Sequence, residues 1–233
     1  MRSYLNHGGL FGRIAARKPL LTKEHIRKRI LWCKQYSAMT EAEWEKVLFS
    51  DESKVEMVSS RRCYVRRHVG QRFKSIYVCK TLRFGGSSIM VWGCLKGDGS
   101  RKLVRCPQKL DSTSYQEVLK EGLYGFYDYD SVFMHDGALC HRSRSTLRYL
   151  DSQNICLMVD WPPFSPDLNI IENVWSILKA KVSKHKCTTR DALWEALCKE
   201  WYAIPNDIII GLYKTLPKRL KAVLMNKGLP IKY

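Results

Sequence analysis

One stretch of this chain, residues 130–181, constrains the fold more than any other. It begins with a short apolar run, 131–135, whose β-branched and aromatic residues predict a buried strand that delivers Asp136 at its carboxyl end. A helical segment and a second apolar run, 155–159, follow, and the two prolines after Trp161 forbid further sheet pairing. The stretch is therefore a strand–helix–strand unit of an α/β sheet.

A second carboxylate follows this unit closely. Apolar residues recur at helical spacing from Ile171 to Leu178, which predicts a helix that begins near Asn169 and carries Glu172 in its first turn. Side chains at the carboxyl ends of strands and at the N-termini of the following helices converge on one crevice. Carboxylates gathered there repel each other unless they share a cation, and their hard oxygen atoms suit Mg²⁺ or Mn²⁺.

A third carboxylate for such a site stands on an earlier strand. The apolar, partly alternating run 47–58 places Asp51 in its middle, where a core-facing aspartate is costly unless it is used. Each carboxylate also has a plain structural reading: Glu172 as half of a capping box, Asp136 in a strand-ending turn, and Asp51 on an exposed edge strand. The combination points to a metal site, although the single residues do not.

Four motifs in this order resemble the catalytic domain of transposases of the mariner superfamily, Tc-one branch: FSDES, GGSSIMVWGC, HDG followed by a histidine, and WPPFSPDLNIIENVW. The resemblance covers nearly the whole chain and implies a catalytic triad of Asp51, Asp136 and Glu172. It also implies that these residues bind two ions, Mg²⁺ or Mn²⁺, for cleavage and strand transfer of DNA. His141 matches a family histidine and is a candidate for orienting a phosphate or a metal-bound water, with a purely structural histidine as the open alternative.

The sequence departs locally from the pattern of that family. Residues 137–140 read Gly-Ala-Leu-Cys where Asn-Asp-Pro-Lys is usual, and Ile170 stands where proline is usual. The spacing from Asp136 to Glu172 is one residue longer than the typical spacing. Three alternatives therefore stay open: an active transposase domain, an inactive transposon relic that binds DNA without sequence preference, and another ribonuclease H-like nuclease such as an integrase or Holliday-junction resolvase.

The charge of the chain points to a polyanionic partner. The 40 Lys and Arg residues against 22 Asp and Glu give a formal net charge of +18, which favours nucleic acid. No apolar run approaches the ~20 residues that span a bilayer, so we expect no membrane partner. The resemblance further implies a nuclear protein that binds double-stranded DNA at transposon ends and target sites, and that could form a homodimer in the DNA complex. The nine cysteines include no CxxC pair, which favours neither a disulfide framework nor a zinc module.

Basic residues gather in three segments that we expect to contact DNA. Residues 1–40 carry a single acidic residue and form an electrostatic arm, for which a solvated helix face is the alternative. The run 61–67 alternates basic with apolar and aromatic residues, as suits phosphate contacts. The segment 215–223 resembles the basic C-terminal part of the family. The candidate DNA contacts are Arg13, Arg17, Lys18, Arg27, Arg61, Arg62, Arg66, Arg67, Lys218 and Arg219.

The expected elements are a meander of three strands, a helix and the strand–helix–strand unit. This order predicts an α/β fold with a mixed sheet of five strands flanked by helices. It is the order found in ribonuclease H-like folds. Strands are expected at 47–58, 89–95, 102–106, 131–135 and 155–159, and helices at 22–37, 40–46, 113–127, 142–150, from 169, at 188–202 and at 207–225. We expect residues 1–40 to be a basic helical arm, the remnant of a helix-turn-helix module and linker whose remainder is missing, and residues 41–233 to be the catalytic domain.

Overall fold

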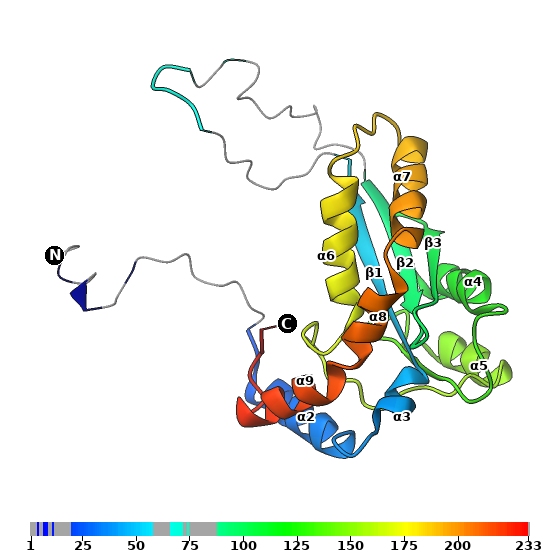
Figure 1. Ribbon diagram of the computed structural model, residues 1–233. Coiled ribbons are helices and arrows are strands. Elements are labelled where there is room, and N and C mark those ends of the chain that lie inside the picture. The colour runs from blue at the N-terminus through cyan, green and yellow to red at the C-terminus, as the bar shows by residue number, and fades with distance from the viewer. Residues whose placement is uncertain are drawn as a thin grey trace.

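The computed structural model describes residues 20–57 and 88–232, together with 66–71, 74 and the single positions 4, 7, 8 and 11. Within these parts, four strands form one mixed sheet in the order β3-β2-β1-β4 (Figure 1). The first three strands form an antiparallel meander, whereas β4 lies parallel to β1 on its other side. The strands are β1 (Val47–Glu56), β2 (Ser88–Leu95), β3 (Arg101–Cys106) and β4 (Val132–Met134).

Most of the described helices begin at a side-chain cap that the sequence marks. Thr22, Thr40 and Thr189 each accept a hydrogen bond from the backbone N–H three residues further on, and Ser143 and Asp111 do the same. None of the described helices is long and apolar enough to span a membrane. The helices are α2 (Lys23–Gln35), α3 (Glu41–Glu45), α4 (Ser112–Leu123), α5 (Arg144–Ser152), α6 (Ile171–Val182), α7 (Arg190–Tyr202), α8 (Asn206–Tyr213) and α9 (Leu216–Met225).

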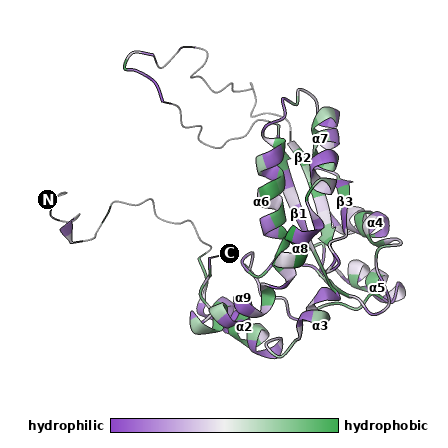
Figure 2. Cartoon of the chain, in the orientation of Figure 1, coloured by the Kyte–Doolittle hydropathy of each residue, from purple (hydrophilic) through white to green (hydrophobic). Residues whose placement is uncertain are grey.

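The alternation of side chains along β1 divides the core between the two faces of the sheet. Val47 and Phe49 belong to the larger core, which also contains the buried faces of α6 and α7, whereas Leu48 packs with α4 and α5 in the second core. Figure 2 shows hydrophilic and hydrophobic residues side by side on α6 and α7, as expected of helices with one buried face. The same alternation directs Asp51 to the α6 face of the sheet and Glu52 to the opposite face.

The last predicted helix is broken into two. The continuous helix expected over 207–225 is replaced by α8 and α9, and the chain turns at Lys214 and Thr215. Pro217 lies in the first turn of α9, where its missing N–H is harmless, but its ring clashes with the turn that a continuous helix would place before it. The prediction of one helix was therefore wrong.

The fifth predicted strand is reduced to a single bridge. Of the run 155–159, only Leu157 pairs with the sheet, in parallel with Phe133 of β4. Asp160 then adopts a φ of 56°, and the two prolines after Trp161 cannot donate to a ladder. In the described residues the sheet therefore has four strands, one fewer than predicted.

The helix predicted within the N-terminal arm is packed into the domain that follows it. Trp32 and Cys33 of α2 lie in the larger core, and α2 lies beside α9 (Figure 1). The guanidinium of Arg29, which is fully buried, binds the carboxylate of Asp167 at 2.6 and 2.8 Å and donates to the carbonyl oxygen of Gly228 at 2.8 Å. Residues 23–35 therefore share a core with the domain that we expected to begin at residue 41.

Candidate active site

The three predicted carboxylates are carried by β1, by the loop after β4 and by the first turn of α6. Phe49 pairs with Met134 at the end of the parallel β1–β4 register, and Asp51 and Asp136 each follow two residues later in their own segments. Burial raises the pKa of Asp51 well above its usual range, and the charges of Glu172 and Asp136 raise it further. Asp51 thus lies within electrostatic range of both Glu172 and Asp136.

Two of these carboxylates, Asp51 and Glu172, are short of positive charge. Burial raises the pKa of Glu172, and the charge of Lys179 on the same helix offsets only part of this effect. Oδ2 of Asp51 accepts a hydrogen bond of 3.1 Å from Nε1 of Trp175, which is a neutral donor. The ionised forms of both carboxylates are therefore disfavoured unless a cation is added to the site.

The third carboxylate, Asp136, is compensated within the protein by His141. Nδ1 of His141 lies 2.8 Å from Oδ1 of Asp136, and its Nε2 lies 3.3 Å from Oε1 of Glu52. The second distance suits an ion pair, but the two atoms are not aligned as a hydrogen bond. Burial lowers the pKa of His141, yet the two carboxylates outweigh burial and raise this pKa to about 10. The hydrogen bond from His141 in turn lowers the pKa of Asp136.

His141 is held in place by a stack of buried rings. Its ring lies 4.0 Å from that of Tyr115 and 5.0 Å from that of His135, centroid to centroid. The Tyr115 hydroxyl lies 3.0 Å from Nδ1 of His135, and burial, together with the charge of His141, lowers the pKa of His135 to about 4. At neutral pH the stack therefore contains one charged and one neutral imidazole, and the charged one faces Asp136.

A buried chain of hydrogen bonds joins the elements that carry the three carboxylates. The hydroxyl of Ser50 donates to the carbonyl oxygen of Met134 at 2.8 Å and so joins β1 to β4. Nδ2 of Asn169 donates to the carbonyl oxygen of Ser50 at 3.2 Å, and Oδ1 of Asn169 accepts from the backbone N–H of Ile171 at 3.2 Å. Asn169 thereby fixes the start of α6 against β1, next to Asp51.

Glu172 does not act as a capping residue. The helix α6 begins at Ile171, has Ile170 at its N-cap and shows no side-chain cap hydrogen bond. Asn169, which the sequence suggested as the cap, instead makes the contacts to Ser50 and Ile171. The plain structural reading of Glu172 is therefore removed, and its position in a partly buried first turn needs another reason.

Comparison with known proteins identifies the family. Residues 46–194 match the family profile described as DDE superfamily endonuclease. The Tc1 transposase of Caenorhabditis elegans is 32% identical over 100% of this chain and 87% of that protein. The Tc3 transposase of the same organism is 33% identical over 92% of this chain and 65% of that protein. The chain belongs to the Tc1/mariner family of DDE transposases.

Solved structures show the same fold at low sequence identity. The Mos1 transposase paired-end complex with the left transposon end matches with a TM-score of 0.81 and 17% identity, over 99% of this chain and 70% of that one. The Mos1 paired-end complex with Mg matches with a TM-score of 0.81 and 17% identity, over 98% and 70%. The catalytic domain of Mos1 alone gives 0.69 and 13%, over 93% and 100%. This transposase domain therefore has the ribonuclease H-like fold of the Mos1 catalytic domain.

The carboxylates of this transposase domain suit a hard divalent cation by their chemistry. They offer oxygen atoms only, and two of them, Asp51 and Glu172, are partly buried with too little positive charge around them. As they stand, no three His, Cys, Asp or Glu side chains among the described residues are close enough together to hold one ion. Asp51 instead faces Trp175, and Asp136 faces His141.

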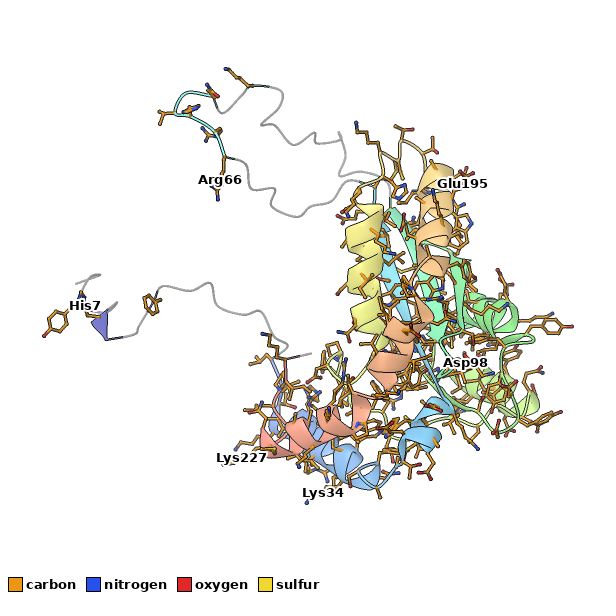
Figure 3. The ribbon with its side chains drawn as sticks, viewed as in Figure 1. His7, Lys34, Arg66, Asp98, Glu195 and Lys227 are labelled. Carbon is orange, nitrogen blue, oxygen red and sulfur yellow. The ribbon has the colours of Figure 1, made fainter. Side chains whose placement is uncertain are left out.

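The described candidates for DNA contacts lie on the surface, with one exception. Arg27 is exposed on α2, where it pairs with Glu24 at 2.9 Å, and Lys218 is exposed on the adjacent α9. Arg66 and Arg67 are exposed in the described segment 66–71, and Figure 3 labels Arg66 there. The remaining candidates lie outside the described residues: Arg13, Arg17, Lys18, Arg61 and Arg62.

The exception is Arg219, which is 7% exposed. Its guanidinium donates to the carbonyl oxygen of Asp167 at 3.0 Å and to Oδ1 of Asn173 at 2.7 Å. The apolar spacing of α9 turns this side chain inward, while Lys218 beside it points to solvent. Arg219 is therefore a structural residue of the domain, and the expectation that it contacts DNA is corrected.

Three residues of the site escaped the sequence analysis as site residues. Trp175 was expected only as part of the apolar face of α6, although it contacts Asp51. Ser50 and Glu52 flank Asp51 in the sequence. The alternation of side chains along β1 correctly predicts that Glu52 lies on the face of the sheet opposite Asp51, but it does not reveal the contact between Glu52 and His141. The partners of these residues come from remote segments, so their roles become visible only in the fold.

Proposed function

We propose that this chain is the catalytic domain of a cut-and-paste DNA transposase that cleaves phosphodiester bonds and transfers the freed 3′ ends. Asp51, Asp136 and Glu172 are its catalytic and metal-binding residues in this proposal. The observation that carries it is the charge of the site. Burial raises the pKa of Asp51 and of Glu172, and the carboxylates around Asp51 raise its pKa further. Bound cations would stabilise the ionised forms of these carboxylates.

Mg²⁺ or Mn²⁺, with two ions bound, is the cofactor that this donor set favours. The Mos1 complexes with Mg and with Mn support this choice, because their fold is that of this chain. Asp51, Asp136 and Glu172 would hold these ions, which would supply Lewis-acid activation of the attacking water or 3′-hydroxyl and charge stabilisation for the leaving 3′ oxygen of the DNA strand.

The residues of the chain itself prepare the site for that chemistry. His141, held as an imidazolium, keeps Asp136 ionised. Trp175 orients Asp51 through one oxygen of its carboxylate and leaves the other oxygen to a cation. Asn169 and Ser50 fix the helix of Glu172 against the strand of Asp51, so that the three carboxylates keep their relative positions.

Double-stranded DNA, at transposon ends and at target sites, is the proposed partner. The net charge of +18 supports it, as does the likeness to a Mos1 complex with a transposon end. We further propose a homodimer in the DNA complex, which would bring two transposon ends together, and the nucleus as the location because the target DNA is there.

The proposal is tested by incubating the purified chain with end-labelled duplex and Mg²⁺ or Mn²⁺, beside Asp136→Asn. Metal-dependent nicking by the natural chain, and none by the variant, is the expected result. Retained DNA binding by both proteins, measured by gel shift, shows that the variant is deficient in chemistry and not in folding. A folded natural chain that binds DNA but never nicks it would instead be an inactive relic.

A further inference from the structure

A groove of about 740 Å³ opens beside Asp136. Asp51 and Glu172 do not line it, and the proposed function gives it no role. Its walls come from α2, from the loop that follows β4, and from the segment around Trp161 that follows the single β-bridge. The polar and charged residues of the lining include Lys28, Gln35, Asp136, Arg142 and Asp160. The groove thus joins the proposed reaction centre to the N-terminal helix of the described domain.

Two cationic side chains from different elements line this groove. Lys28 projects from α2 and Arg142 from the loop after β4, and both residues are exposed. The amine of Lys28 is 3.9 Å from Glu24, at the outer limit of an ion pair. Arg142 makes no ion pair with any residue in the described part of the chain. Both cations are therefore available to an anionic ligand.

The groove also offers apolar and aromatic surface between these cations. Leu31 is 51% exposed, and Trp161 is only partly buried, with its ring 4.9 Å from that of Trp32 in an edge-on contact. The exposed amide of Gln35 adds a donor and an acceptor. Cations for phosphates, an aromatic face for stacking and an amide for base edges together match the chemistry of single-stranded nucleic acid.

The partly exposed Trp161 ring in the groove favours an unpaired strand over a duplex. A base within a duplex has both faces covered by its neighbours, so the Trp161 ring can stack only on a base that has left the helix. Arg142 lines the same groove as Asp136, and its Cδ lies 3.6 Å from the position that a Cβ would take at Gly137, so a phosphate on Arg142 would be close to the proposed reaction centre. The walls therefore fit a short unpaired segment next to the scissile phosphate.

We propose that this groove binds an unpaired segment of the DNA strand that is cut, with phosphates on Lys28 and Arg142 and a base against Trp161. The inference rests on the proposed function for the identity of the strand, but its binding chemistry needs no metal. Asp160 is the groove carboxylate outside the triad, and it repels the phosphates of the bound segment.

The test measures binding of a fluorescent twelve-nucleotide single strand to the full chain in EDTA, over a range of salt concentrations. The affinity falls as salt rises, and this dependence should be weaker in Lys28→Gln/Arg142→Gln. The slope of log affinity against log salt should become less negative by about 0.7 for each phosphate that the variant no longer neutralises. The matched control is Lys34→Gln/Arg148→Gln, which removes the same charge from exposed residues of α2 and α5 outside the groove. Asp160→Asn should bind the single strand more tightly than the natural chain does.

Equal salt slopes in the two double variants, or no increase in affinity from Asp160→Asn, would overturn the groove assignment. Nicking of labelled duplex with Mg²⁺ by the natural chain is measured in parallel, because it reports on the proposed function alone. A natural chain that nicks DNA while the two double variants bind alike contradicts the groove and leaves the transposase function standing. A natural chain that never nicks, with binding weakened only in the groove variant, contradicts the function and leaves the groove standing.

Discussion

Nε1 of Trp175 donates a hydrogen bond of 3.1 Å to Oδ2 of Asp51 and so joins the helix that carries Glu172 to strand β1. Gly93 makes this contact possible. It lies opposite Asp51 in the β1–β2 register, and a Cβ atom at this position would lie 2.6 Å from the Trp175 ring. The close packing of α6 on β2 thus sets the orientation of a carboxylate on β1.

Trp175→Phe should reduce metal-dependent nicking without unfolding the domain. Phenylalanine keeps an aromatic ring in the core but removes the N–H that orients Asp51. The expected loss in rate is roughly tenfold or more, because a hydrogen bond to a charged group contributes roughly 1.5–3 kcal/mol. Trp201→Phe is the matched control, since its ring lies 4.9 Å from that of Trp175 and its Nε1 makes no hydrogen bond to the described residues. Equal losses of nicking in the two variants would assign Trp175 to packing alone.

Ser50→Ala should weaken both the fold and the reaction, because it removes the side-chain hydrogen bond from β1 to the carbonyl oxygen of Met134 on β4. The loss of one such hydrogen bond costs about 0.5–1.5 kcal/mol, which urea denaturation will measure. Ser53→Ala is the control on the same strand. Ser53 is 6% exposed, and its side chain makes no hydrogen bond within the described residues. Equal stability of the two variants would show that the hydroxyl of Ser50 does not join β1 to β4.

The sequence predicted the elements whose signals are local. Thr22, Thr40 and Thr189 mark helix starts because an N-cap needs only a side chain and the N–H three residues on. The strand with Asp51 was recognisable because a period of two is a property of the strand itself. The break before Pro217 was missed because the apolar spacing continues across it and hides the steric clash.

The sequence could not predict the contacts that join distant segments. The inward direction of Arg219 depends on Asn173 and on the carbonyl of Asp167, both on another part of the chain. The role of Trp175 depends on the absence of a side chain at Gly93. The proposed triad rests on the combination of the three carboxylates and on the family resemblance, since each carboxylate alone had a plain structural reading.

Arg29→Met should destabilise the whole domain, although Arg29 lies in the segment predicted to be an arm. The substitution leaves Asp167, which is 2% exposed, as a buried charge without its partner. Removing one partner of a buried ion pair costs about 3–5 kcal/mol, which a thermal melt will detect. Lys23→Met on the exposed side of α2 serves as control. A melting temperature unchanged by Arg29→Met would show that α2 is not part of the domain core.

Asp51→Asn should stabilise the metal-free protein at neutral pH. The pKa of Asp51 in the folded state is raised by burial and by neighbouring carboxylates, so the folded state binds the proton more tightly than the unfolded state does. Stability is therefore lost as the pH rises from the unfolded pKa of about 3.9 through the raised folded pKa. Melting in EDTA between these pH values should show this decline in the natural chain and a weaker one in the variant. A natural chain whose stability rises with pH relative to the variant would contradict the assigned charge balance.

Glu172→Gln separates a metal-binding role from a structural one. Because α6 shows no side-chain cap, glutamine removes no hydrogen bond that starts the helix, and it replaces a partly buried carboxylate whose pKa burial has raised. We expect an unchanged or slightly higher melting temperature in EDTA, unchanged DNA binding, and loss of nicking with Mg²⁺ or Mn²⁺. In addition, Mg²⁺ should raise the melting temperature of the natural chain but not that of the variant, because only the natural chain can hold the ion. Glu195→Gln, on the exposed surface of α7 (Figure 3), removes the same charge far from the chemistry and should keep both the nicking and the response to Mg²⁺. Equal nicking by Glu172→Gln and the natural chain would mean that Glu172 is not a ligand and that the site is built on Asp51 and Asp136 alone.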